Sequence, residues 1–327
     1  MKDAAPIRLA YASTIVNALL VGFSFLFAKM ALLHASPMDT LAFRFAASFG
    51  LLCIPAALGW LRLNYRGKPV GKLLLLTTSY PLGFFIFQTF GLQQSTSADA
   101  GVLFALGPIV TAVLASLMLK ETTTLLQKLS ILLSVAGVVY IFMMKEGRVS
   151  FSSSTGILLL LVSVLAIAFF SVLTRSLLRS FTTTEILFLL QGIGFVFFMG
   201  WSLLRHMAAG TLPQFTAPLA SGSFVIDILY LGVLSSLVTS LTSVYALSKI
   251  KASVVSVFSN LATVVSVAAG TFVLGEPVTD ASLLGSALVI AGAAGVALLG
   301  RTSASATTAV KATTAGPHSA LTKGAES

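Results

Sequence analysis

Long apolar runs fill most of the chain, and short polar breaks separate them. A bilayer core about 30 Å thick needs about 20 apolar residues per helix. The runs are apolar on all sides rather than alternating, which excludes a membrane β-barrel. Breaks at clusters of Gly, Pro, Ser and charges predict ten spans, near residues 9–33, 39–61, 73–92, 98–119, 126–144, 155–175, 184–204, 223–247, 252–274 and 281–300. The pattern therefore predicts an all-α integral membrane protein.

The composition agrees with this prediction. The chain is 57% hydrophobic and 9% charged, whereas soluble domains carry about 25% charged residues. Its formal net charge of +10 would suit a nucleic-acid partner, but the basic residues lie in short clusters between apolar runs. We therefore expect membrane lipid, and no nucleic acid, around the protein. The single cysteine, Cys53, allows no intrachain disulfide and no cysteine-built metal site, and no cofactor is expected.

The distribution of Lys and Arg predicts the orientation. With the N-terminus inside, the inner segments hold fifteen Lys and Arg residues, whereas the outer loops hold only Lys145, Arg148 and Arg205. The positive-inside rule then places both termini in the cytoplasm and the chain in the cell (inner) membrane. Residues 301–327, rich in Ala, Thr, Ser and Gly, are expected to form a disordered cytoplasmic tail.

An internal repeat divides the chain. The segment from Gly107 to Glu121 recurs, 155 residues later, as the segment from Ala262 to Glu276. Five predicted helices separate the copies, and because five is odd the two halves must be inverted relative to each other. Inverted repeats over residues 1–149 and 150–300 are typical of secondary transporters that work by alternating access. The alternative is that duplication served only to enlarge the bundle.

Three motifs resemble the EamA-type branch of the drug/metabolite transporter (DMT) superfamily. They are Leu106-Gly-Pro108 with Glu121 thirteen residues after the proline, Leu274-Gly-Glu-Pro277, and Leu41-Ala-Phe-Arg-Phe45. The resemblance covers about residues 9–300 and implies ten helices in two inverted five-helix repeats. It also implies export of amino acids or other small metabolites without ATP.

The chain departs from this family pattern at two positions. Thr263 stands where the family usually has the proline of the second repeat, and Lys120 replaces the glycine before Glu121. We therefore expect the ninth helix to be less kinked than the fourth.

Two cations inside the spans are candidates for substrate binding, because a charge at the bilayer centre costs about 2.5–3.5 kcal/mol. Lys29 precedes the turn around Ser36 by seven residues and Arg44 follows it by eight, so both lie roughly 10 Å below that turn. Together they would hold a carboxylate, with Arg44 offering a bidentate fork. The alternative for Lys29 is snorkelling to the outer interface or a structural ion pair.

A comparison of the halves separates these two cations. A shift of 146 residues places Lys29 on Arg175 and Asp39 on Glu185, which suits a recurring structural clamp. The same shift places Arg44 on an apolar leucine. Because Arg44 has no equivalent, we predict a role for it in substrate handling or gating.

Neutral polar residues in the spans should face inward, because hydrocarbon offers them no partner. The candidates for substrate binding are Asn17, Tyr80, Gln88, Gln191, Tyr245 and Asn260. The alternative for each is an ordinary interhelical hydrogen bond, worth about 0.6 kcal/mol.

Two further features are candidates for the transport cycle. Gly107 and Pro108, predicted in mid-helix, are hinge candidates, with a static kink as the alternative. Asp227, about one turn into the eighth helix, is the candidate for proton coupling, and stabilisation by the helix dipole is the alternative.

These observations favour a secondary active exporter of small metabolites that uses alternating access, with proton coupling left open. An integral-membrane enzyme is disfavoured because the three histidines lack a neighbouring carboxylate constellation. An ATP-driven pump is disfavoured because no Gly-rich nucleotide loop with a lysine occurs. Among transporters, the alternative is a nucleotide-sugar or other organic-anion carrier. Outside transport, a further alternative is a sensor. Small residues of the tenth helix (Ala287, Ala291, Gly295) and fifth helix (Ser130, Ser134) predict close packing, as a scaffold or a homodimer face.

Overall fold

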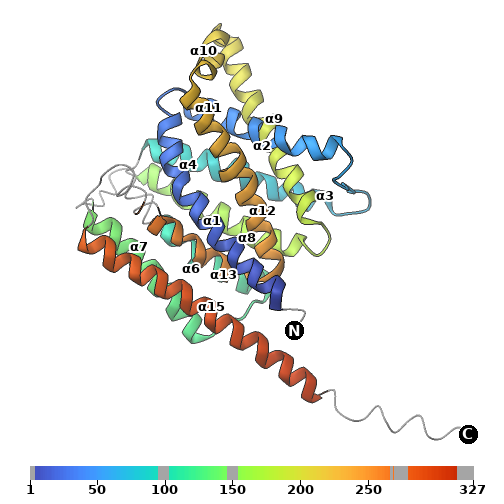
Figure 1. Cartoon of the computed structure of the whole chain (residues 1–327), viewed down its shortest axis with the longest axis vertical. Coiled ribbons are helices and arrows are strands. Elements are labelled where there is room, and N and C mark those ends of the chain that lie inside the picture. Colours follow the sequence, from blue (N-terminus) through green and yellow to red (C-terminus); the bar gives the residue numbers. More distant parts are fainter. Residues whose placement is uncertain (1–3, 95–102, 146–153, 266–267, 269–278, 315–327) are drawn as a thin grey trace, which may run out of the picture.

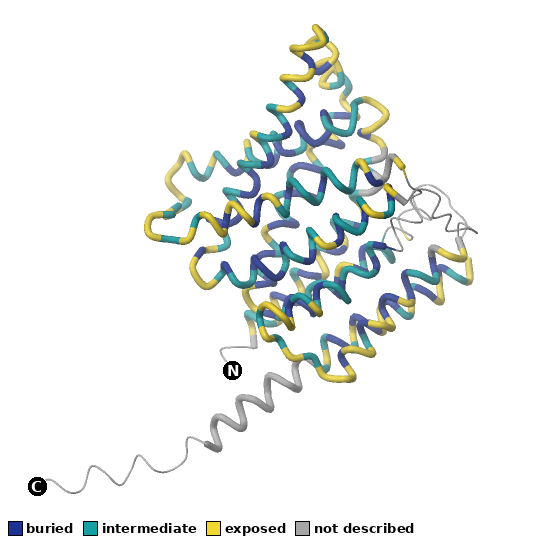
Figure 2. Tube along the Cα trace, turned by 180° about the vertical axis from the view of Figure 1, so that it is seen from behind, coloured by how far each residue is buried: buried dark blue, intermediate teal, exposed yellow. Residues whose placement is uncertain are grey.

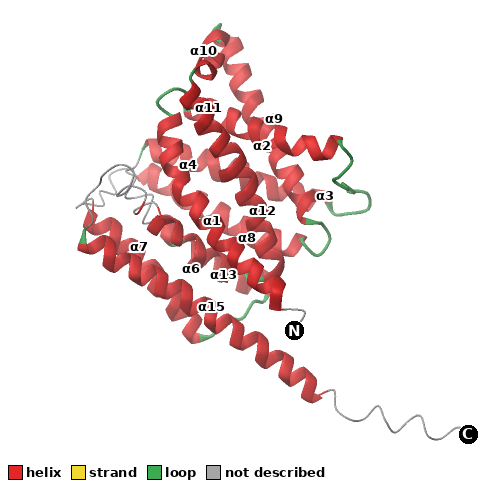
Figure 3. Cartoon of the chain, in the orientation of Figure 1, coloured by secondary structure: helices red, strands yellow, loops and turns green. Residues whose placement is uncertain are grey.

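The computed structural model describes residues 4–94, 103–145, 154–265, 268 and 279–314 (Figure 1). In these residues the regular elements are all helices, as Figure 3 shows, so the predicted all-α class is confirmed. The elements are α1 (Ala4–Ala31), α2 (Pro37–Ala57), α3 (Val70–Thr77), η1 (Thr78–Gly83), α4 (Phe84–Gln93), α6 (Gly107–Leu119), α7 (Leu125–Lys145), α8 (Ser154–Leu177), α9 (Thr183–Ala209), α10 (Leu212–Thr216), η2 (Ala217–Ala220), α11 (Gly222–Leu229), η3 (Tyr230–Val238), α12 (Thr239–Lys249), α13 (Ala252–Ser259) and α15 (Asp280–Thr314).

A helical segment lies at each of the places where the apolar pattern predicts a span. Seven of these segments in the described chain are long and apolar enough to cross a membrane. Three are shorter apolar helices, over Leu103–Leu119, Leu125–Ile141 and Ala252–Val265. Figure 2 shows buried residues along the packed faces of the helices and exposed residues on the outward faces and in the connecting loops. On a membrane helix such outward apolar side chains contact lipid.

Helix α15 extends beyond the span that the sequence predicts. It continues to Thr314, so the helix includes residues 301–314, which are expected to be disordered. This stretch contains four alanines, the residue with the highest helix propensity, and no Gly or Pro. Residues 315–327 lie outside the described part of the chain.

Two of the long helices are interrupted by segments of π-helix. In η1 the chain leaves helical geometry at Tyr80 (φ −144°, ψ 125°), directly before Pro81, which has no backbone N–H to donate. In η3 the residues from Tyr230 to Val238 are wound as π-helix without any proline. Such turns are rare in proteins and occur frequently at functional sites.

The predicted break at Gly107 and Pro108 exists, but its position differs. The chain turns at Leu106, and α6 begins at Gly107, so Pro108 is the second residue of a helix rather than a mid-helix residue. Proline is favoured there because the first N–H groups of a helix have no intrahelical acceptor. The hinge role of Gly107 and Pro108 stays a prediction. The helix ends at Lys120, whose left-handed conformation (φ 54°) explains why a glycine would suit this position.

Helices α7 and α15 form a close pair along one edge of the molecule (Figure 1). A Cβ atom on Gly285 would lie 2.7 Å from the carbonyl oxygen of Gly137, and one on Gly292 would lie 2.6 Å from that of Ser130. The backbones can approach this closely only because these positions are glycine. Gly295 also packs on Ser130, as the small-residue pattern predicts.

Two residues of the predicted small-residue pattern on α15 do not join this seam. Ala287 and Ala291 are exposed, so they face away from α7. A dimer formed through that face stays a prediction.

Candidate functional site

Arg44 lies at the centre of a polar cluster inside the bundle. Its Nε donates a hydrogen bond to Ser236 Oγ (2.5 Å), and its Nη2 donates to the carbonyl oxygen (3.0 Å) and to Oγ (3.1 Å) of Ser235. Both serines are buried and belong to η3. The guanidinium also lies over the ring of Phe85, 5.1 Å from its centroid. Neutral oxygens and an aromatic face therefore hold this cation.

Arg44 has no acidic partner in the described chain. The ion pairs found there join other groups, and no carboxylate approaches the guanidinium within 4.0 Å. A charge away from water is costly unless an opposite charge and hydrogen bonds compensate for it. Among the described residues, the charge of Arg44 is therefore compensated only by neutral hydrogen-bond acceptors and the Phe85 ring.

Gln191 and Tyr80 lie beside Arg44. The Nε2 of Gln191, on α9, donates to the carbonyl oxygen of Ser236 (3.2 Å) and to Ser240 Oγ (3.2 Å). Its Oε1 is buried and has no donor among the described residues. Tyr80, in η1, lies close to Arg44 and to Ser240. We call Arg44, Tyr80, Gln191, Ser235 and Ser236 the Arg44 site.

Asn17 is connected to the edge of this site. Its Nδ2 donates to the carbonyl oxygen of Thr239 (2.7 Å) and to Thr242 Oγ1 (3.3 Å), which joins α1 to α12. Thr239 Oγ1 in turn donates to the carbonyl oxygen of Ser235 (2.7 Å). Asn17 is thus two hydrogen bonds from a direct contact of Arg44.

Four other candidates lie elsewhere or cannot be placed. Asn260 donates to Ser134 Oγ (3.2 Å) and so ties α13 to α7, which is the packing role left open above. Tyr245 packs against a buried apolar cluster that contains residues of α7 and α13. Gln88 is half-buried on α4, and the described contacts of the Arg44 site do not include it. Lys29 lies on α1, but its side chain is outside the described part of the structure, so the Lys29 and Arg44 pair stays a prediction.

The serines of η3 and the glycine before them are functional candidates that the sequence pattern does not predict. A Cβ atom on Gly232 would lie 2.6 Å from Ala47 Cβ and 2.7 Å from the carbonyl oxygen of Arg44. The glycine therefore lets η3 approach α2 closely enough for Ser235 and Ser236 to reach the guanidinium. The only signal in the sequence is a Gly and a Ser-Ser pair within an apolar run.

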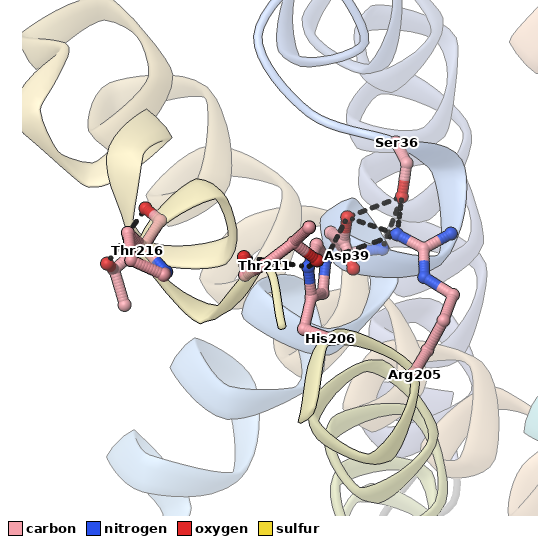
Figure 4. Close-up of polar contacts among 7 residues, drawn as sticks. Ser36, Asp39, Arg205, His206, Thr211 and Thr216 are labelled. Carbon is pink, nitrogen blue, oxygen red and sulfur yellow. Dashed lines mark hydrogen bonds and ion pairs between the residues drawn. The ribbon is translucent and has the colours of Figure 1, made fainter. Parts of the chain in front are cut away.

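An ion-pair cluster lies at the beginning of α2 (Figure 4). Ser36 caps the helix by accepting from the N–H of Asp39. Oδ2 of Asp39 lies 3.0 Å from Arg205 Nη2 and 3.2 Å from His206 Nε2, both at the end of α9. His206 Nδ1 lies 2.7 Å from Thr211 Oγ1. The start of α2 is thereby fastened to the end of α9.

A second cluster lies at the beginning of α9. Thr182 and Glu185 form a capping box, and Lys68 Nζ pairs with Glu185 Oε2 at 2.7 Å. The backbone N–H of Asn64 donates to Oε1 (3.0 Å), and the hydroxyl of Tyr65 donates to the Glu185 carbonyl oxygen (2.9 Å). Burial, and then the Glu185 charge, raise the pKa of Tyr65 to about 12. The hydroxyl therefore stays protonated and remains a donor at physiological pH.

Asp39 and Glu185, which the 146-residue shift makes equivalent, both take part in ion pairs, but the clamp as predicted also includes Lys29 and Arg175. Each carboxylate lies in the first turn of its helix. Asp39 of α2 pairs with Arg205 near the end of α9, and Glu185 of α9 pairs with Lys68 in the connection between α2 and α3. Arg175 instead pairs with Glu121 at the end of α6 (2.6 Å), beside a cavity of about 260 Å³. Glu121 is therefore a helix-end residue with a cation partner.

The comparisons with known proteins agree with one another. The model of the EamA-like transporter family matches residues 8–143 and again residues 154–298. The chain is 42% identical over 286 residues to the uncharacterized transporter YcxC of Bacillus subtilis (strain 168), covering 88% of this chain and 92% of that protein. It is 29% identical over 274 residues to an uncharacterized transporter of Archaeoglobus fulgidus, covering 83% and 92%. A solved crystal structure has the same fold, with a TM-score of 0.72 at 20% identity, over 89% of this chain and 98% of that one.

These matches confirm the resemblance that the motifs around Arg44 and Pro108 carry. The family is one of transporters and not of enzymes, and its members in the DMT superfamily carry small molecules. Two successive matches to one family model also correspond to the repeat read from the sequence. The chain is a multi-pass membrane protein that belongs to the EamA-like transporter family.

Proposed function

We propose that the protein is a secondary active exporter of small metabolites that carry a carboxylate group, such as amino acids. The observation that carries this proposal is the positive charge of Arg44, which has no carboxylate partner among the described residues. An anionic substrate supplies the missing charge. Charge-assisted hydrogen bonds of this kind are about twice as strong as neutral ones.

The neighbours of Arg44 suit the rest of such a substrate. The unpaired Oε1 of Gln191 accepts a hydrogen bond from an amine or hydroxyl group. The rings of Phe85 and Phe170 flank the site, with Phe170 4.6 Å from the ring of Tyr80, and favour an apolar side chain. The described contacts of the site contain one cation only. This favours a single carboxylate over the diphosphate of a nucleotide sugar, which is the alternative within transport.

The proposed mechanism is alternating access between two inverted halves. All ten predicted helices cross the cell membrane, the halves are residues 1–149 and 150–300, and both termini lie in the cytoplasm. The two family matches, over residues 8–143 and 154–298, support this division. The π-helical segments η1 and η3 lie next to Arg44 and are suited to local rearrangement, because their backbones depart from regular α-helix.

The transport activity can be tested with the purified protein in proteoliposomes. We expect exchange of a radiolabelled mixture of amino acids and short-chain carboxylic acids, and no exchange of the matching amides and esters, because these lack the carboxylate. Empty liposomes and liposomes containing heat-unfolded protein are the controls. Equal exchange of the acids and their amides would contradict the proposal.

The inverted arrangement can be tested separately by labelling single cysteines. In a Cys53→Ser background, Thr122→Cys lies in the turn after α6 and Thr279→Cys lies directly before α15, and both positions are exposed. We expect a membrane-impermeant maleimide added to intact cells to label Thr279→Cys, and to label Thr122→Cys only after the cells are opened. Labelling of both residues from the same side would exclude an inverted repeat.

A further inference from the structure

Asp227 is a buried carboxyl group with one oxygen that has no hydrogen-bond partner among the described residues. It lies on α11 and is 2% exposed, and its Oδ2 has no hydrogen-bond donor. In the part of the chain that the structure describes, no cation lies within 4.0 Å of it. Asp39 and Glu185 are held in ion pairs, whereas Asp227 has no cation at that distance among the described residues.

The surroundings of Asp227 are largely apolar. Phe224 and Ile228 on the same helix belong to a buried aromatic and aliphatic cluster with Phe43 of α2, and Leu231 of η3 belongs to it too. Removing an unpaired carboxylate from water into such a setting is costly, whereas a protonated carboxyl group is tolerated. The charged form of Asp227 is therefore disfavoured for as long as α11 keeps this position.

Few other titratable or charged groups face Asp227 from the elements packed against it. From the turn between α1 and α2, His34 lies within electrostatic reach. Tyr230, one turn further along, donates its hydroxyl to the carbonyl oxygen of Leu20 on α1 (3.1 Å). On α2, Asp39 is occupied by its own cations. Lys29 also belongs to α1, with its side chain outside the described residues.

Polar side chains lie between Asp227 and the exposed end of α11. His34 is exposed, and its Nε2 lies 3.3 Å from Oγ of the exposed Ser223. Ser223 precedes Asp227 by four residues, so the two share a face of α11. In the other direction α11 continues into η3, which carries the two serines that hold Arg44.

We propose that Asp227 is the binding site of a coupling proton, and this inference rests on the proposed export function. A proton from the water at the His34 end binds the Asp227 carboxylate. The neutral carboxyl group is then accommodated in the apolar cluster while η3, which follows α11, keeps its contacts with Arg44. Releasing the proton to water on the other side leaves a carboxylate that must move towards water, and this motion carries η3 and its contacts to Arg44. Each cycle moves one proton inwards and one substrate outwards.

Asp227→Asn, which mimics the protonated carboxyl group permanently, tests the proposal. The assay uses proteoliposomes with the radiolabelled mixture of amino acids and short-chain carboxylic acids, first in exchange and then under an imposed pH gradient. We expect the native protein to accumulate label when the gradient is imposed. Asp227→Asn should keep exchange and lose the response to the gradient completely.

The matched control is Asp280→Asn, which removes an exposed carboxylate at the start of α15 and should keep both activities. Three outcomes decide between the two ideas. Absence of exchange in the native protein would overturn the proposed export function. Exchange that does not respond to the gradient in the native protein, or a full response in Asp227→Asn, would overturn only the proton site.

Discussion

Replacing Arg44 with glutamine should lower export of carboxylate substrates by roughly 30–150-fold, which corresponds to about 2–3 kcal/mol of lost charge-assisted hydrogen bonding. Glutamine keeps a donor for Ser235 or Ser236 but removes the positive charge that receives the substrate. Concentration-dependent exchange in proteoliposomes measures the effect. The fall should appear in flux at low substrate concentration, because binding is what the variant loses.

Companion variants separate binding from folding. Arg44→Lys keeps the charge but not the planar fork, so it should retain part of the activity. Arg62→Gln removes an exposed cation from the loop after α2 and should leave exchange unchanged. Arg44→Gln should not lower the midpoint of thermal unfolding, because the guanidinium is an uncompensated charge. A lower midpoint with unaltered exchange per folded molecule would assign Arg44 a structural role.

Gly232→Ala should destabilise the protein by about 1–3 kcal/mol, the usual cost of forcing an extra methyl group into a packed interior. The new Cβ would lie 2.7 Å from the carbonyl oxygen of Arg44 and 2.6 Å from Ala47 Cβ. Because a backbone atom is one of the two neighbours, a side-chain rotation cannot relieve the clash. Thermal unfolding of the purified protein in detergent measures the loss.

Gly200→Ala, on α9, is the control for this variant. Its Cβ would meet nothing within 4 Å, so the better helix propensity of alanine should raise the stability by up to about 1 kcal/mol. The two glycine substitutions are therefore expected to have opposite signs. Equal midpoints for the two variants would mean that η3 does not approach α2 as closely as described.

The helices were predictable because their cause is local. A run of about 20 apolar residues has few alternatives in a membrane, so helical segments occur at each predicted place. Arg44 was predictable for a related reason, since a charge within an apolar run is costly enough to require a purpose. Neither inference needs knowledge of a distant partner.

The partners of Arg44 could not be predicted in this way. Serine in an apolar helix usually bonds its own backbone, as Ser163 does with the carbonyl oxygen of Leu160 (2.7 Å). Nothing in the sequence distinguishes Ser235 and Ser236 from such a residue. The difference arises from π-helical winding without a proline and from a glycine that admits another helix.

The roles of the neutral polar candidates could not be predicted for the same reason. A polar side chain in the middle of a span must face protein, but the amino-acid sequence does not say which neighbouring helix it contacts. Asn17 and Asn260 look alike in the sequence, yet one bonds α12 beside the Arg44 site and the other bonds α7. Their roles depend on tertiary packing, which the apolar pattern leaves open.

The ion-pair clusters at Asp39 and Glu185 restrict how α2 and α9 can move. Asp39 is tied to the end of α9, and Glu185 is tied to the segment that follows α2. If one helix slid along the other, the contacts of both Asp39 and Glu185 would be stretched. If the two helices tilted together, both sets of contacts would be kept. If α2 and α9 move during transport, we therefore expect them to tilt together, with Arg44 of α2, rather than to slide along each other.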